Sequence, residues 1–179
     1  MEEAHAAAEL MMDKRVDYLV AVASIVYADG TASPDELAVL TMLCTVLDLT
    51  PRGVEVVVDA ARRPDAARVA EIVAGLEGDR IKHALLTDAI LVAFADGRVA
   101  REESREIAEF ASALGVSAAH ASLIGKYVEE VIVEAQGHEL SRALSEGLAE
   151  SHAEPQPARG VKWLYRKLIA AREAHLPKK

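Results

Sequence analysis

Hydrophobic residues recur at helical spacing through most of this 179-residue chain. Between residues 3 and 28 they predict one helix, with a break near Asp13, from positions Leu10, Met11, Val16, Leu19, Val20, Ala23, Ile25 and Val26. The run Ser33-Pro34-Asp35-Glu36 combines a capping hydroxyl, a proline at the first helical position and a glutamate three residues after the cap. It therefore predicts the start of a second helix, which extends to about Leu47.

The same kinds of signal divide the rest of the chain into helices. Thr50-Pro51 predicts a helix to about Ala61, and Arg62-Arg63-Pro64-Asp65 interrupts the pattern before another helix toward Ala74. Further helices are expected at about residues 79–95, 101–114, 117–136 and 139–150. Because β-branched runs are short and aromatic residues scarce, we expect an all-α fold, with residues 1–150 forming one helical domain.

One segment of the pattern occurs twice. Tyr27-Ala28-Asp29-Gly30 leads to Asp35-Glu36, and Phe94-Ala95-Asp96-Gly97 leads to Glu102-Glu103, so that one constant shift along the chain superimposes the two copies. The same shift aligns Leu47 with Leu114 and Leu49 with Val116. The sequence thus predicts two pseudo-symmetric helical repeats, at about residues 16–50 and 83–117.

The C-terminal part has a different composition. Residues 151–158 contain two prolines and little apolar area, which is typical of a linker. Residues 159–176 then place apolar side chains at helical spacing beside basic ones, which predicts a basic amphipathic helix. This helix could dock on the rest of the chain or bind a protein partner or an anionic membrane surface.

Charge is distributed unevenly along the chain. Residues 1–157 have a net charge of −15, whereas residues 158–179 have a net charge of +6. An acidic body disfavours nucleic acid as a partner, because phosphate binding requires a basic face. No apolar run reaches membrane-spanning length and no basic leader is present, so we expect a cytoplasmic protein without a transmembrane segment. The single cysteine, Cys44, fits a core position.

The duplicated acidic segments contain half of a calcium-binding pattern. An EF-hand loop carries an acid at position 5, glycine at position 6 and a bidentate glutamate at position 12. Asp29, Gly30 and Glu36 match these positions, and Asp96, Gly97 and Glu103 match them again. Positions 1 and 3 are apolar or aromatic in both copies, so neither segment is a complete EF-hand.

If the repeats pack around a pseudo-two-fold axis, the two segments could share one cation. Asp29, Glu36, Asp96 and Glu103 would then be the metal ligands, with Asp35 and Glu102 as secondary candidates. Carboxylate oxygens favour Ca²⁺ or Mg²⁺ over Zn²⁺. The structural alternative is that Glu36 only completes a capping box with Ser33 and that the other acids occupy turns and helix starts.

The paired Ala-Asp-Gly-x-x-x-x-x-Glu segments, each followed by a helix ending in Leu47-Asp48-Leu49-Thr50 or Leu114-Gly115-Val116-Ser117, resemble the TerB-like family associated with tellurite resistance. The resemblance covers roughly residues 16–136. It implies a pseudo-symmetric helical fold and an acidic, metal-binding surface. It also implies a role in stress responses and an association with Ter complexes at the inner membrane.

No motif for catalysis stands out. The chain lacks a phosphate-binding glycine loop, a nucleophile elbow and a His-Glu-x-x-His motif. Asp79 and His83 share a helix face, but one such pair is a weak metal signal. We therefore expect a non-enzymatic, TerB-like module that binds or senses a divalent cation. The alternative is a metal-free scaffold for protein partners that uses the acidic face and the basic C-terminal helix.

Overall fold

The computed structural model describes residues 5–27, 30–95 and 101–136. All regular elements in these ranges are helical, which confirms the predicted all-α class. They are a short 3₁₀ helix, η1 (Ala6–Glu9), and the α-helices α1 (Met12–Val26), α2 (Pro34–Val46), α3 (Pro51–Arg62), α4 (Ala66–Ala74), α5 (Asp79–Ala93), α6 (Arg101–Ala113) and α7 (Ala118–Gln136). Within the same ranges, no helix has the length and apolar content needed to cross a membrane.

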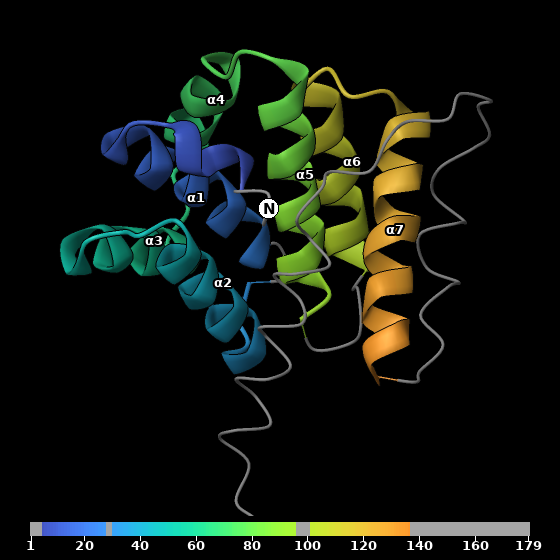
Figure 1. The fold of residues 1–179 in the computed structure, drawn as a ribbon, viewed down its shortest axis with the longest axis horizontal. Coiled ribbons are helices and arrows are strands. Elements are labelled where there is room, and N and C mark those ends of the chain that lie inside the picture. Colours follow the sequence, from blue (N-terminus) through green and yellow to red (C-terminus); the bar gives the residue numbers. More distant parts are fainter. Residues whose placement is uncertain (1–4, 28–29, 96–100, 137–179) are drawn as a thin grey trace, which may run out of the picture.

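Two helices form the centre of the fold. α1 packs against α2, α3, α4 and α5, while α5 packs against α1, α2, α6 and α7. Figure 1 shows the consequence: α2, α3 and α4 surround α1 on one side, and α6 and α7 extend the fold beyond α5 on the other. The consecutive residues 84–93 of α5 are all buried. A helix buried on all sides must be apolar around its whole circumference, as this segment largely is.

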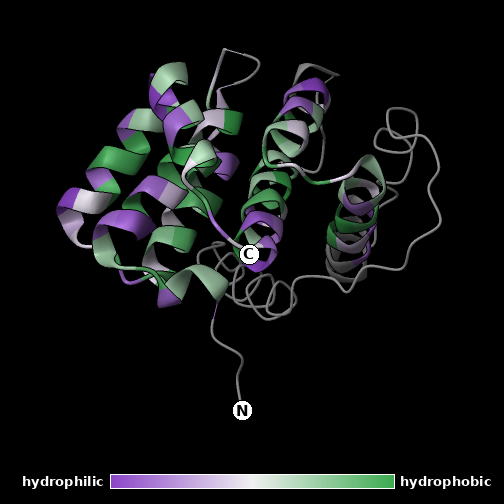
Figure 2. Cartoon of the chain, turned by 90° about the horizontal axis from the view of Figure 1, so that it is seen from above, coloured by the Kyte–Doolittle hydropathy of each residue, from purple (hydrophilic) through white to green (hydrophobic). Residues whose placement is uncertain are grey.

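The outer helices are more amphipathic. α3 buries only Gly53, Val57 and Ala61, which lie one helical turn apart on one face. Figure 2 shows hydrophobic residues in green and hydrophilic residues in purple on different sides of the outer helices. Burial of one face per helix accounts for the helical periodicity in the sequence.

Four of the predicted helix starts coincide with capping contacts. Ser33 caps α2, Thr50 caps α3 by accepting a hydrogen bond from the Gly53 N–H, and Asp65 caps α4. The Ser117 hydroxyl accepts a hydrogen bond from the backbone N–H of His120 at the start of α7. These side chains satisfy backbone donors that have no partner inside the helix, which is why the sequence marks the starts well.

The N-terminal helix differs from the prediction. The expected break near Asp13 lies instead at Leu10 and Met11, whose backbones are extended, and Asp13 is inside α1. Arg15 explains why this conformation is stable. Its guanidinium donates hydrogen bonds to the carbonyl oxygens of Ala8, Leu10 and Leu47, at 2.6, 2.8 and 3.0 Å. A side chain on α1 thus fixes both the segment before it and the end of α2.

Helix boundaries repeat with the shift found in the sequence. The shift that superimposes the two acidic segments also superimposes helix boundaries. It aligns α1 with α5 and α2 with α6 at both ends, and it aligns α3 with α7 at the first residue. The turns after α2 and α6 also match, because Asp48 and Gly115 both have positive φ, 55° and 71°. The relation of the two halves by a pseudo-two-fold axis stays a prediction.

Candidate functional site

The helices that flank the two acidic segments end and begin at one end of the molecule. In Figure 1, α1 and α5 both run toward the lower end of the view, and α2 and α6 both begin there. α1 and α5 are in direct contact. Asp29 and Asp96 themselves lie outside the described residues, as does the separation between them.

Glu36 is held in a capping box. Its Oε2 accepts a hydrogen bond from the backbone N–H of Ser33 at 2.7 Å, and the Ser33 hydroxyl accepts one from the N–H of Glu36 at 3.2 Å. The glutamate is only 4% exposed, although it lies in the first turn of a helix. The capping role that the sequence predicted as the structural alternative is therefore present.

The other candidate ligands are only partly placed. Asp35 is exposed in the first turn of α2. Glu102 and Glu103 lie in the first turn of α6, where the structure describes the backbone but not these side chains. Among the described side chains, no group of three or more His, Cys, Asp or Glu residues could hold a metal ion. The predicted set of four carboxylate ligands thus includes Asp29 and Asp96, which lie outside the described residues, and Glu103, whose side chain is not described.

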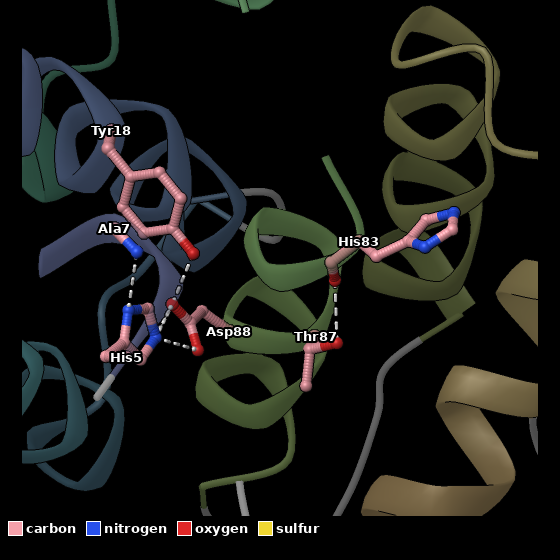
Figure 3. A network of polar contacts seen from close by, with 6 residues as sticks. All are labelled: His5, Ala7, Tyr18, His83, Thr87 and Asp88. Atoms are coloured by element: carbon pink, nitrogen blue, oxygen red, sulfur yellow. Dashed lines mark hydrogen bonds and ion pairs between the residues drawn. The ribbon is translucent and has the colours of Figure 1, made fainter. Parts of the chain in front are cut away.

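A buried polar network that the sequence did not single out connects η1, α1 and α5 (Figure 3). Asp88, on α5, is 1% exposed. Its Oδ2 accepts a hydrogen bond of 2.6 Å from the Tyr18 hydroxyl on α1 and lies 3.0 Å from Nε2 of His5. Buried carboxylates are costly unless they are paired, so these two donors make the position of Asp88 tolerable.

The hydrogen bonds also define the state of the His5 ring. Nδ1 accepts a hydrogen bond of 3.1 Å from the backbone N–H of Ala7, so the proton of the neutral ring is on Nε2, facing Asp88. Burial lowers the pKa of His5, but the Asp88 carboxylate outweighs it and raises that pKa above its usual value. The positive charge of Arg80 also lowers the pKa of His5, but it does not cancel the rise that Asp88 causes.

Tyr18 serves as a neutral donor in this network. Burial, and then the negative charge of Asp88, raise the pKa of the phenol well above its usual value. The sequence did contain one signal for the network, since Asp88 is the single charged residue within the run 84–93. The identity of its partners was not readable, because they are 70 and 83 positions away.

A second polar contact lies where α5 meets α7. The rings of His83 and His120 have centroids 5.4 Å apart, at an angle of 49°. Burial and then the neighbouring His120 lower the pKa of His83, and Asp79 opposes them. The sequence pattern predicted that Asp79 and His83 share a helix face. It could not predict the contact with His120, because that residue lies on a helix that begins much later in the chain.

Cys44 is buried in α2, as predicted, and burial raises the pKa of its thiol to about 11. A thiol in that state is a poor nucleophile at neutral pH. The predicted helix at residues 139–150, the linker at residues 151–158 and the basic helix at residues 159–176 lie outside the described residues.

Comparisons with models of known protein families, with curated proteins and with solved structures found no match for this chain.

Proposed function

We propose that this chain is a TerB-like, non-enzymatic helical module that binds a hard divalent cation, Ca²⁺ or Mg²⁺, through its two acidic segments. The observation that carries the proposal is the repeated helix arrangement around them. One constant shift along the chain relates the helices before and after the first segment to those before and after the second. The helix ends that flank the two acidic segments also lie toward the same end of the molecule (Figure 1).

The ligands in this proposal are Asp29, Glu36, Asp96 and Glu103, with Asp35 and Glu102 as neighbours. Ca²⁺ takes six to eight oxygen ligands, so a single segment with two carboxylates would bind weakly, whereas two segments together supply four carboxylates. Water molecules would complete the shell. A cation shared in this way would tie the α1–α2 connection to the α5–α6 connection, and its binding would stabilise both.

The capping box is compatible with such a role for Glu36. A carboxylate has about four lone-pair sites, so one such group can accept a hydrogen bond like that from the Ser33 N–H and also coordinate a cation. The cap also fixes the side chain near the start of α2. A ligand held in place before the ion arrives loses less conformational entropy on binding.

In the cell, we propose that the module acts in a stress response as a cation-dependent adaptor for protein partners. A Ter-type complex at the inner face of the membrane is the assembly that the family resemblance favours. The location would be cytoplasmic, with peripheral attachment through such partners. Residues 1–157 and residues 158–179 carry opposite net charges, which favours contacts with charged partners.

The second candidate function is a scaffold that binds partners without a metal. The specific observation in its favour is the capping box of Glu36, a structural role for this carboxylate that requires no metal. Under this alternative, Asp29 and Asp96 are turn residues, and the acidic face binds partners directly.

Thermal unfolding of the chelator-treated protein separates these two functions. A cation that binds only the folded state raises the unfolding temperature. We expect Ca²⁺ or Mg²⁺ to raise it for the wild type but not for an Asp29→Ala/Asp96→Ala variant. The Glu36→Gln variant tests the metal-binding role of Glu36 separately from its capping role, because glutamine keeps the capping contact and removes the charge. A lack of response to any hard cation at millimolar concentration would favour the metal-free scaffold.

A further inference from the structure

His83 and His120 bring two imidazole rings together from different helices. His83 is the fifth residue of α5 and His120 the third residue of α7. Their ring centroids are 5.4 Å apart, and both side chains are partly exposed at the surface. An ion and its water molecules can therefore reach the rings without unfolding the core.

The His120 ring is positioned by a hydrogen-bonding neighbour. Nδ1 lies 3.1 Å from the Ser117 hydroxyl, which also accepts the backbone N–H of His120 at 3.3 Å. When Nδ1 carries the proton and donates it to this hydroxyl, the lone pair is on Nε2. Metal-binding histidines commonly have a second partner of this kind, which fixes the tautomer and the orientation of the ring.

The surroundings also keep His83 in the form that binds metals. Only a neutral imidazole has a lone pair for coordination. Burial and the neighbouring His120 lower the pKa of His83, so protons compete less with a metal at neutral pH. Asp79, one helical turn earlier, supplies a negative charge that favours a bound cation.

We propose that His83 and His120 form a surface site for a borderline divalent transition metal: Zn²⁺, Cu²⁺ or Ni²⁺. Imidazole nitrogen suits these ions, whereas Ca²⁺ and Mg²⁺ prefer oxygen. Two nitrogens on one tetrahedral zinc are about 3.3 Å apart, given Zn–N bonds of about 2.0 Å. Rings with centroids 5.4 Å apart reach that separation when their edges face each other.

In this proposal, water molecules fill the remaining coordination positions. Within the described side chains, no third His, Cys, Asp or Glu completes a metal-binding group with this pair. The site is therefore open, unlike the closed four-ligand sites that hold structural zinc. The positive N-terminal ends of α5 and α7 oppose a cation only weakly, and Asp79 offsets part of this effect.

This site does not depend on the proposed function of the acidic segments. His83 lies about 15 Å along α5 from Ala93, at a rise of about 1.5 Å per residue, and the acidic segment follows that end of the helix. A metal here would join α5 directly to α7. The two sites also differ in chemistry, with nitrogen ligands in one and oxygen ligands in the other.

Calorimetric titration of Zn²⁺ into the chelator-treated full chain at neutral pH tests the proposal. We expect micromolar binding with one ion per chain. Ser117→Ala should weaken it by about tenfold, and His83→Gln or His120→Gln should weaken it more. His175→Gln controls for other histidines, and Asp29→Ala/Asp96→Ala controls for the acidic segments. Both control variants should bind Zn²⁺ as the wild type does.

Electron paramagnetic resonance of the Cu²⁺-loaded wild type gives a measurement that needs no variant. The proposal predicts hyperfine structure from two imidazole nitrogens. It is overturned if the wild type binds no Zn²⁺ at micromolar concentration, or if binding persists unchanged in the His83→Gln/His120→Gln variant. A copper spectrum without imidazole nitrogen would overturn it as well.

Discussion

The Tyr18 hydroxyl on α1 donates a hydrogen bond of 2.6 Å to the Asp88 carboxylate on α5, inside the core of the protein. The same carboxylate lies 3.0 Å from Nε2 of His5, so three segments of the chain meet at one buried charge (Figure 3). Because an unpaired buried carboxylate is strongly unfavourable, each donor matters more than a surface contact would. The packing of α1 on α5 is thus specified by polar contacts as well as by apolar ones.

Removing the Tyr18 hydroxyl should destabilise the protein measurably. Tyr18→Phe keeps the ring and leaves Asp88 with His5 as its remaining donor from this network. A hydrogen bond to a charged group contributes about 1.5–3 kcal/mol, so we expect the free energy of unfolding to fall by about that amount. Urea denaturation followed by circular dichroism measures this change.

The matched control is Tyr27→Phe, which removes a hydroxyl from a side chain that is 39% exposed. Its free energy of unfolding should stay within about 0.5 kcal/mol of the wild type. Equal effects of the two substitutions would contradict the role assigned to the Tyr18–Asp88 hydrogen bond.

The His5–Asp88 contact should make stability depend on pH. Because Asp88 raises the pKa of His5 above its usual 6.5, the folded protein binds the His5 proton more tightly than the unfolded chain does. The resulting stabilisation is fully present below pH 6.5 and is lost as the pH rises through the raised pKa. The difference in unfolding free energy between the wild type and His5→Gln should therefore shrink toward alkaline pH. A difference that is constant across this window would refute the pKa assignment.

The two members of the capping box should respond differently to substitution. Ser33→Ala removes the cap of α2 and should lower the free energy of unfolding by about 1 kcal/mol. Glu36→Gln keeps an acceptor for the Ser33 N–H, so without added metal it should change stability by less than about 0.5 kcal/mol. Chemical denaturation of both variants in chelator measures these effects. A large loss of stability in Glu36→Gln would show that the charge, not the cap, matters in the metal-free state.

The matched turns after α2 and α6 allow a reciprocal test. Gly115 has a φ of 71°, and a Cβ added there would meet no atom within 4 Å, so the cost of Gly115→Ala is conformational. We expect that substitution to lower the unfolding free energy by about 1 kcal/mol. Asp48→Gly should stay within about 0.5 kcal/mol of the wild type, because relief of backbone strain offsets the gain in unfolded-state entropy. Thermal denaturation of the pair provides the comparison.

The helices were predictable because their signals are local. Pro34, Pro51 and the capping residues mark helix starts through contacts between near neighbours in the chain, and the apolar spacing gives the buried faces. The break before α1 was misplaced for the opposite reason. Leu10 and Met11 are extended because Arg15 binds the carbonyl groups of Ala8, Leu10 and Leu47. The contact with Leu47, 32 residues away, leaves no trace in a local pattern.

In the candidate sites, too, local contacts were predictable from the sequence and long-range contacts were not. The capping role of Glu36 could be predicted from a short local motif, and the structure contains it. The Tyr18–Asp88 bond and the His83–His120 pair join residues that are far apart in the sequence, so they depend on helix packing that spacing alone does not encode. The sequence indicated that Asp88 is a charged residue in an apolar run, but it could not predict which side chains donate hydrogen bonds to it.

The most direct test of the cation proposal is an equilibrium titration of Ca²⁺ into chelator-treated protein, read out as ions bound per chain. A shared site formed by Asp29, Glu36, Asp96 and Glu103 predicts one ion per chain, with binding lost in the Asp29→Asn/Asp96→Asn variant. If neither Ca²⁺ nor, in a parallel titration, Mg²⁺ binds at millimolar concentration, or if the double variant retains the binding, the account is contradicted.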